Sequence, residues 1–117
     1  MDIYFNSEKL QKNCNSEKLS VKKWGPEMAK LIQQRLMELR AADCLSDISN
    51  LPPPRCHMLD GNRDGCFAVD LKDPFRLVFE PLHNPLPLKD DGGIDRTRVT
   101  SILILEVVNY HGKQKRR

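Results

Sequence analysis

Residues 66–80 read CFAVDLKDPFRLVFE and predict two β-strands joined by a tight turn. The turn falls on residues 72–74, because aspartate and proline favour the backbone angles at which a chain reverses. Side chains alternate between the two faces of a strand, so every second residue points the same way. The apolar residues that share a face are Phe67, Val69 and Leu71 in the first strand, and Leu77 and Phe79 in the second. This stretch therefore predicts a hairpin with an apolar face, as in an antiparallel sheet.

Further strands are predicted on both sides of this hairpin. Residues 57–59 precede it across the turn-forming segment 61–65 (GNRDG), and residues 2–5 (DIYF) open the chain as a short β-prone run. Residues 101–110 form the last strand, which is apolar on both faces and should therefore lie centrally in the sheet. Prolines and paired glycines in residues 81–97 predict a loop before it.

Two helices are predicted between the first strand and the hairpin. Residues 8–14 form a short one, and Gly25-Pro26 begins a longer one that should run to about Ala42, since proline is favoured at the first helical position. Apolar residues recur in the longer helix at three- and four-residue spacing, while polar side chains such as Arg35 occupy its other face. The order of one strand, two helices and four strands predicts an α+β fold, with the helices on one side of a mainly antiparallel sheet.

The composition is that of one globular domain. The 117 residues are 39% hydrophobic and 30% charged. No apolar run approaches the about 18 residues of a membrane span, and the N-terminus lacks the apolar core of a signal peptide. We therefore expect a cytoplasmic protein that does not bind membranes and whose four cysteines stay reduced. Because no Cys-x-x-Cys pair occurs, we expect neither a metal site nor a cofactor.

Positive charge is concentrated at the C-terminus. The chain has a net charge of +3, and four of its positive charges fall in the last five residues, on Lys113, Lys115, Arg116 and Arg117. Such a tail attracts phosphates because binding releases their counterions. The alternative is a solvated terminus without a function.

The polar residues that could carry chemistry lie at strand ends and turns, and they are His57, Arg63, Arg76, Tyr110 and His111. RNA cleavage without a metal needs a base for the 2′-hydroxyl, an acid for the departing 5′-oxygen, and cations for the crowded phosphorane. Histidine suits the proton transfers because its ordinary pKa of about 6.5 lies near working pH. Arginine suits phosphate because its planar fork stays charged, and tyrosine can stack on a base.

Each of these residues also has an interpretation without catalysis. His57 could be a hydrogen-bonded strand residue, and Arg63 could lie in a solvated turn. Tyr110 could pack at a strand end, and Arg76 could form an ion pair with Glu80 or Glu106. His83, in the proline-rich loop, is given no role.

Three segments resemble one known protein family in order and spacing. Residues 52–65 (PPPRCHMLDGNRDG) are similar to the RxHxLKGxRxG segment of the HigB branch of RelE-type toxins. Residues 75–80 (FRLVFE) resemble that family's xRLxFE strand, and residues 104–111 (ILEVVNYH) resemble its closing EIxDYH. The resemblance covers residues 1–111, which we interpret as a single RelE-like domain, and leaves residues 112–117 as a basic tail.

The resemblance implies a toxin that enters the ribosomal A site and cuts messenger RNA there without a metal. It also implies a HigA-like antitoxin with a helix-turn-helix part, through which alone the pair would contact operator DNA. By position, the catalytic group would be His57, Arg76, Tyr110 and His111. Arg63 and the basic tail would then bind RNA.

The sequence departs from the family pattern at Asp60, where lysine is usual, and at Asn109, where aspartate is usual. Asp60 places a negative charge near the expected phosphate site, which should weaken phosphate binding. The basic tail, where family members commonly end, could compensate for that charge. These departures leave a second hypothesis open, a RelE-fold protein that has lost catalysis and only binds its antitoxin. A gyrase poison of the related ParE branch and an unrelated basic RNA-binding domain are further alternatives.

Overall fold

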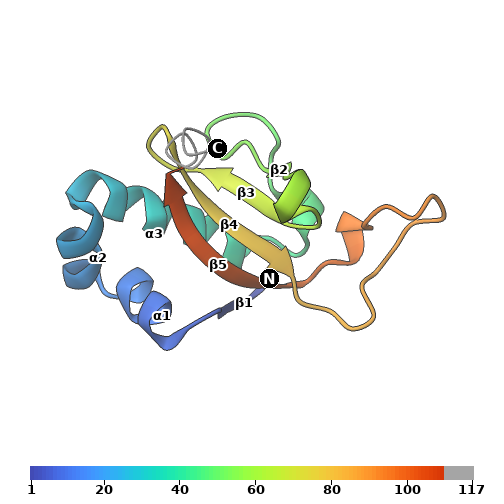
Figure 1. Ribbon diagram of the computed structural model, residues 1–117, viewed down its shortest axis with the longest axis horizontal. Coiled ribbons are helices and arrows are strands. Elements are labelled where there is room, and N and C mark those ends of the chain that lie inside the picture. The colour runs from blue at the N-terminus through green and yellow to red at the C-terminus, as the bar shows by residue number, and fades with distance from the viewer. Residues whose placement is uncertain (110–117) are drawn as a thin grey trace.

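The structure is a computed structural model and describes residues 1–109 (Figure 1). Its strands are β1 (Asp2–Phe5), β2 (His57–Met58), β3 (Phe67–Asp70), β4 (Phe75–Pro81) and β5 (Ser101–Asn109). Its α-helices are α1 (Glu8–Asn15), α2 (Glu17–Trp24) and α3 (Pro26–Ala41). Short 3₁₀ helices are η1 (Leu45–Asp47), η2 (Gly61–Arg63) and η3 (Arg96–Arg98). The predicted α+β class is confirmed.

The strands form one sheet in the order β1-β5-β4-β3-β2. Neighbouring strands are antiparallel except β1, which runs parallel to β5. The mainly antiparallel sheet predicted from the sequence is therefore confirmed. The last strand is paired on both sides, as its apolar faces predicted, but the middle of the sheet is β4.

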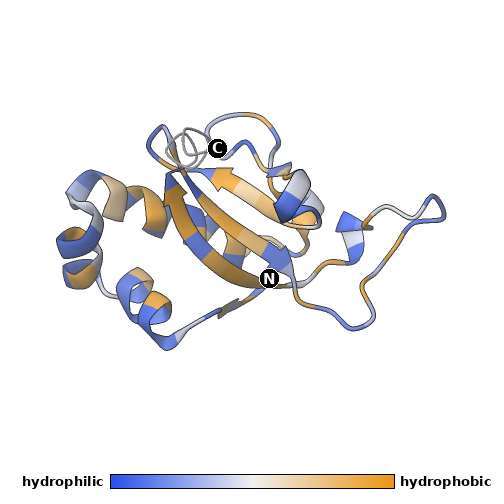
Figure 2. Ribbon diagram, in the orientation of Figure 1, coloured by the Kyte–Doolittle hydropathy of each residue, from blue (hydrophilic) through white to orange (hydrophobic). Residues whose placement is uncertain are grey.

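In the described part of the chain, helix α3 packs against one face of the sheet. Apolar side chains of β3 and β4, among them Phe67, Val69 and Leu77, join α3 residues in the main core. The expected alternation of the hairpin is thus confirmed, and Figure 2 shows hydrophobic residues gathered on strands β3, β4 and β5. A smaller cluster on the opposite face contains Ala68, Val78 and Val108 with Leu59.

Helix α3 begins and ends almost where the sequence predicted. Pro26 occupies its first turn, and Met28, Ile32 and Leu36 face the sheet as buried residues. Arg35, expected on the exposed face, is instead only 4% exposed.

The prediction of two helices is wrong, because residues 17–24 form the additional helix α2. This segment is rich in lysine and has no broad apolar stripe, and Val21 remains exposed. A helix still forms because Ser16 caps it by accepting from the backbone N–H of Leu19, while Lys22 and Lys23 complement its C-terminal end.

Residues 82–100 form a long arm beside the sheet, in orange in Figure 1. The loop expected here is confirmed, with a single bridge between Leu88 and Ile94 and the short helix η3 near its end. His83 Nε2 accepts hydrogen bonds from the backbone N–H groups of Thr100 and Ser101 at 3.0 and 3.3 Å, so it ties the two ends of the arm together.

Candidate active site

The β3–β4 hairpin places an aspartate opposite an arginine. Asp70, the last residue of β3, lies directly across from Arg76 of β4. The two side chains form an ion pair in which Arg76 Nε donates to Asp70 Oδ1 at 3.1 Å. Opposed charges of this kind stabilise an antiparallel pair by about 0.2–1 kcal/mol. The sequence interpretation offered Glu80 or Glu106 as partners of Arg76 and did not consider Asp70.

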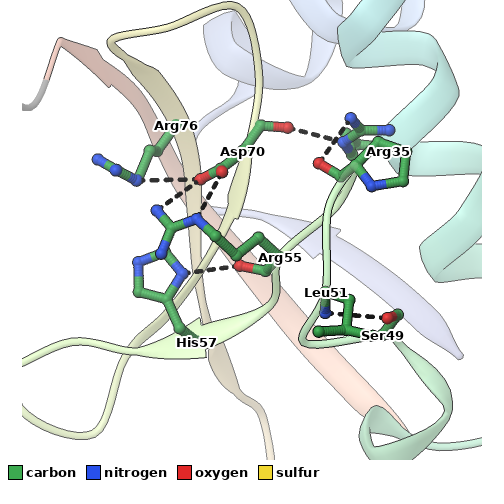
Figure 3. A network of polar contacts seen from close by, with 8 residues as sticks. Arg35, Ser49, Leu51, Arg55, His57, Asp70 and Arg76 are labelled. Atoms are coloured by element: carbon green, nitrogen blue, oxygen red, sulfur yellow. Dashed lines mark hydrogen bonds and ion pairs between the residues drawn. The ribbon is translucent and has the colours of Figure 1, made fainter.

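A second arginine binds the same carboxylate (Figure 3). Arg55 Nε donates to Asp70 Oδ2 at 2.7 Å, and Arg55 Nη2 donates to Oδ1 at 3.0 Å. The hydrogen bond to Asp70, opposed by partial burial, raises the pKa of the Arg55 guanidinium, which therefore stays charged. One carboxylate thus fixes two guanidinium groups.

The backbone at Arg55 adopts an unusual conformation that serves this arrangement. Its φ is +46°, in the left-handed region that costs non-glycine residues about 1 kcal/mol or more. Arg55 N–H donates to the carbonyl oxygen of Leu51 at 3.0 Å, which closes the turn that contains the three prolines. The residue can then present its side chain to Asp70 and its carbonyl oxygen to His57.

His57, at the start of β2, is oriented by that carbonyl. Its Nδ1 lies 2.7 Å from the carbonyl oxygen of Arg55 (Figure 3). Because a carbonyl oxygen can only accept, Nδ1 carries the proton and Nε2 is the basic nitrogen of the neutral ring. The arrangement therefore prepares His57 to accept a proton at Nε2.

These residues share the sheet face opposite the helices. Directly opposed residues in neighbouring strands lie on the same face, and the register pairs His57 with Ala68 and Asp70 with Arg76. The Asp70 side chain is 27% exposed and that of Arg76 is 17% exposed, so both are accessible to a ligand. The face therefore combines a proton acceptor with clustered cations, which is the chemistry that phosphodiester cleavage needs.

Arg63, expected to hold phosphate, forms an ion pair with Glu106 of β5. Glu106 lies opposite Val78 and so on the same sheet face as Arg76. Cys66 lies nearby, and burial together with the charge of Glu80 raises the pKa of its thiol. Arg63 thus pairs with an acidic residue that lies on the same sheet face as Arg76.

The structure brings together only some of the predicted site residues. His57 and Arg76 both join the network around Arg55 and Asp70, and their catalytic roles remain predictions. Other predicted site residues lie outside the described part of the chain, and they are Tyr110, His111, Lys113, Lys115, Arg116 and Arg117.

The two departures from the family pattern differ in position. Asp60 is exposed and comes directly before η2. Asn109 is the exposed last residue of β5 and lies opposite Phe75. Asp60 is therefore open to solvent, which screens its charge.

Sequence reasoning missed Arg55, Asp70 and the buried Arg35. Arg55 stands at the first arginine of the RxHxLKGxRxG pattern, and Asp70 and Arg76 are equally far from Asp73 in the predicted turn. Counting outward from that turn would have paired them. Arg35 forms a local ion pair with Glu38 three residues later, but no comparable signal marks its bonds to the backbone carbonyls of Asp70 and Pro53.

The cysteines do not form a metal site within residues 1–109. All four are free thiols, and burial raises the pKa of Cys14 and of Cys56 to about 11 each. Within residues 1–109, no three His, Cys, Asp or Glu side chains cluster as metal ligands would. In the same range, no helix has both the length and the apolar character needed to span a membrane.

Comparison with known proteins identifies the fold. A chain in the YoeB–YefM complex from Staphylococcus aureus is similar over 92% of the present chain and 93% of that chain, with a TM-score of 0.52 and 15% sequence identity. This similarity confirms the RelE-like architecture predicted from the sequence. No protein-family model and no curated protein matches the chain.

Proposed function

We propose that this chain is the toxin of a toxin–antitoxin pair and acts as a metal-independent endoribonuclease that cuts messenger RNA on the ribosome. One observation carries the proposal, the placing of His57, Arg55 and Arg76 around Asp70 on the sheet face opposite the helices. The RelE-like fold and the three resembling segments support it.

In the proposed reaction, His57 Nε2 takes the proton of the 2′-hydroxyl as its oxygen attacks the adjacent phosphorus. Arg76 neutralises the charge that grows on the phosphorane oxygens, because preorganised cations stabilise such charge without reorganisation. The bond to the 5′-oxygen breaks, and an acid returns a proton to that oxygen. We assign this role to His111 and base stacking to Tyr110; the family resemblance implies only that both belong to the catalytic group, and the division of acid and base between His57 and His111 is our own proposal. The products are a 2′,3′-cyclic phosphate and a free 5′-hydroxyl.

A partner protein belongs to the proposal. The similar solved chain is part of a complex of two proteins, YoeB and YefM. We propose a HigA-like antitoxin with a helix-turn-helix part as the partner of this chain, and contact with operator DNA through that antitoxin only. The ribosome and its messenger would be the targets, in the cytoplasm. Residues 1–111 would form the toxin domain and residues 112–117 an RNA-binding tail.

The alternative is a RelE-fold protein that only binds its antitoxin. Asp60 favours it, because a negative charge stands where the resembling family has lysine. The ion pair between Arg63 and Glu106 also favours this alternative, because Glu106 already neutralises an arginine that was expected to bind phosphate.

The test uses the purified full chain with ribosomes programmed by a defined messenger, and primer extension to map the cuts. Wild type is compared with Arg76→Ala and with the matched control Arg98→Ala, which removes an arginine paired with Asp95 in the arm. We expect A-site cuts that require ribosomes, are lost in Arg76→Ala and persist in Arg98→Ala.

Absence of cuts by folded wild-type protein that still binds a co-expressed antitoxin would contradict the nuclease and support the binding protein. Equal losses in both variants would contradict a specific role for Arg76. Circular dichroism of each variant checks that it is folded.

A further inference from the structure

A single carboxylate holds the two arginines of the proposed site in one arrangement. Asp70 Oδ1 accepts from both Arg76 Nε and Arg55 Nη2, and Oδ2 accepts from Arg55 Nε. The bonds to Asp70 thus engage one edge of each guanidinium. Figure 3 shows the outer nitrogens of Arg76 pointing away from Asp70. A phosphate oxygen could meet those nitrogens while the Asp70 contact persists.

The charges explain why this carboxylate sets the spacing of the arginines. Two guanidinium groups this close repel each other, and the repulsion is strong where water is partly excluded. Asp70 offsets the repulsion and leaves the group of three with a net charge of +1. Replacing the carboxylate by a neutral group would let Arg55 and Arg76 separate.

The rest of the protein holds Asp70 and Arg55 firmly. Arg35 donates from Nε to the Asp70 carbonyl oxygen at 2.7 Å and from Nη2 to the Pro53 carbonyl oxygen at 3.1 Å. This buried side chain therefore joins the end of β3 to the segment that carries Arg55. The left-handed backbone of Arg55 is fixed by its N–H, which donates to the Leu51 carbonyl oxygen at 3.0 Å. A frame fixed from both sides is what positions catalytic groups accurately.

We propose that Asp70 is a positioning residue that holds Arg55 and Arg76 ready for one phosphodiester, and that Arg55 is the second cation of the site. This inference rests on the proposed function. Asp70 acts through the arginines and does not touch RNA. The phosphate meets both guanidinium groups in pairs of N–H donors, the geometry that arginine favours.

The Asp70→Asn substitution separates this role from simple electrostatics. Removing a negative charge favours RNA binding, whereas losing the shared acceptor misplaces both cations. Misplacement by about 1 Å costs on the order of 100-fold in rate. We therefore expect the cleavage rate at saturating ribosomes to fall about 10- to 100-fold, while the half-saturating ribosome concentration stays equal or falls. Because a partly unfolded variant would also lower the rate without changing the half-saturating concentration, circular dichroism measures the folded fraction of Asp70→Asn and the rate is expressed per folded molecule.

The experiment combines single-turnover cleavage with nitrogen-15 NMR of arginine Nε–Hε groups. The variants are Asp70→Asn, Arg55→Lys, which keeps the charge but loses the paired donors, and the control Asp90→Asn on the exposed arm. The NMR probe is an RNA dinucleotide blocked at the 2′-oxygen by methylation. In wild type, we expect the Arg55 and Arg76 signals to titrate together with one Kd. Both signals should move in free Asp70→Asn, and neither should move in Asp90→Asn.

The outcomes separate this inference from the proposed function. Cleavage by Asp70→Asn at the wild-type rate, or a dinucleotide response at only one arginine or at neither, would overturn the inference. A wild type that never cuts messenger but shows joint titration of both arginines would overturn the nuclease and support the paired phosphate site. Loss of rate in Arg55→Lys with unchanged affinity would add support, even if Asp70→Asn folded poorly.

Discussion

Arg35 of α3 donates from Nε to the carbonyl oxygen of Asp70 at 2.7 Å, and so connects the helix layer to the residue at the centre of the site. The Asp70 side chain points to the opposite face of the sheet, where it binds Arg55 and Arg76. Helix packing and site geometry therefore meet at one residue. Because Arg35 is only 4% exposed, its charge depends on protein groups for solvation.

Replacing Arg35 by methionine should destabilise the protein strongly. The substitution keeps an unbranched side chain in the core, but it leaves the carbonyl oxygens of Asp70 and Pro53 without this donor and Glu38 without its ion-pair partner. We expect the free energy of unfolding to fall by about 3 kcal/mol, as measured by urea denaturation. The control Arg40→Met removes an exposed arginine from the same helix and should change it by less than about 0.5 kcal/mol. Similar losses in both would contradict a special role for the buried contacts.

His57→Asn tests the proposed base without disturbing its anchor. The asparagine amide nitrogen can still donate to the Arg55 carbonyl oxygen, but nothing replaces Nε2. We expect ribosome-dependent cleavage to fall by about 10²–10⁴-fold with thermal unfolding unchanged. Primer extension and circular dichroism measure the two quantities.

The matched control for this test is His83→Gln, which retains an acceptor for the backbone at Thr100. It should cut at close to the wild-type rate. A His57→Asn variant as active as this control would exclude His57 as the base.

The hairpin was predictable because its signals are local. Alternating apolar residues and the Asp73-Pro74 turn lie within residues 66–80, and the structure confirms both strands. Helix α2 was missed because its stability depends on end capping by Ser16 more than on an apolar stripe. The sequence also could not show that β5 lies next to the middle strand and not in the middle itself. Two apolar faces indicate only that a strand has neighbouring strands on both sides.

The site was partly predictable for the same reason. His57 and Arg76 fall in recognisable sequence segments. The contact between Asp70 and Arg55, in contrast, joins positions 15 residues apart and depends on the left-handed backbone of Arg55. The burial of Arg35 depends on a carbonyl 35 positions away. Such partners arise only once the sheet and helix have packed, and residue types alone do not specify them.

Arg63 should contribute to RNA binding mainly through charge. Arg63→Ala is expected to weaken binding of a fluorescein-labelled RNA oligonucleotide and to reduce the slope of log affinity against log salt by about 1. Glu106→Gln should strengthen binding, because Arg63 no longer shares its charge with that carboxylate. Fluorescence anisotropy at several salt concentrations measures both. An Arg63→Ala slope equal to that of Arg98→Ala would show that Arg63 contacts no phosphate.

The buried thiols predict loss of stability in alkali. Burial, partly offset by Arg40 and by Arg96, raises the pKa values of Cys14 and Cys56 to about 11 from the ordinary value of 9.0. The unfolded chain therefore loses these protons first, so their contribution is complete below pH 9 and is lost as the pH rises to about 11. The urea midpoint of wild type should fall across this range. The fall should be shallower in Cys56→Ala than in Cys44→Ala; equal slopes would contradict the assignment.

Asp60→Lys should raise cleavage if Asp60 lies near the RNA phosphate. The residue is exposed directly before η2, and its carbonyl oxygen accepts from Arg63 N–H at 3.3 Å, so a lysine there would stand close to the proposed binding face. Solvent screens exposed charges, and we therefore expect an increase of only a few-fold that shrinks as salt is raised. The control Asp90→Lys makes the same charge change on the arm. Single-turnover cleavage at two salt concentrations compares them, and an Asp60→Lys rate no higher than the control's would place Asp60 away from the phosphate.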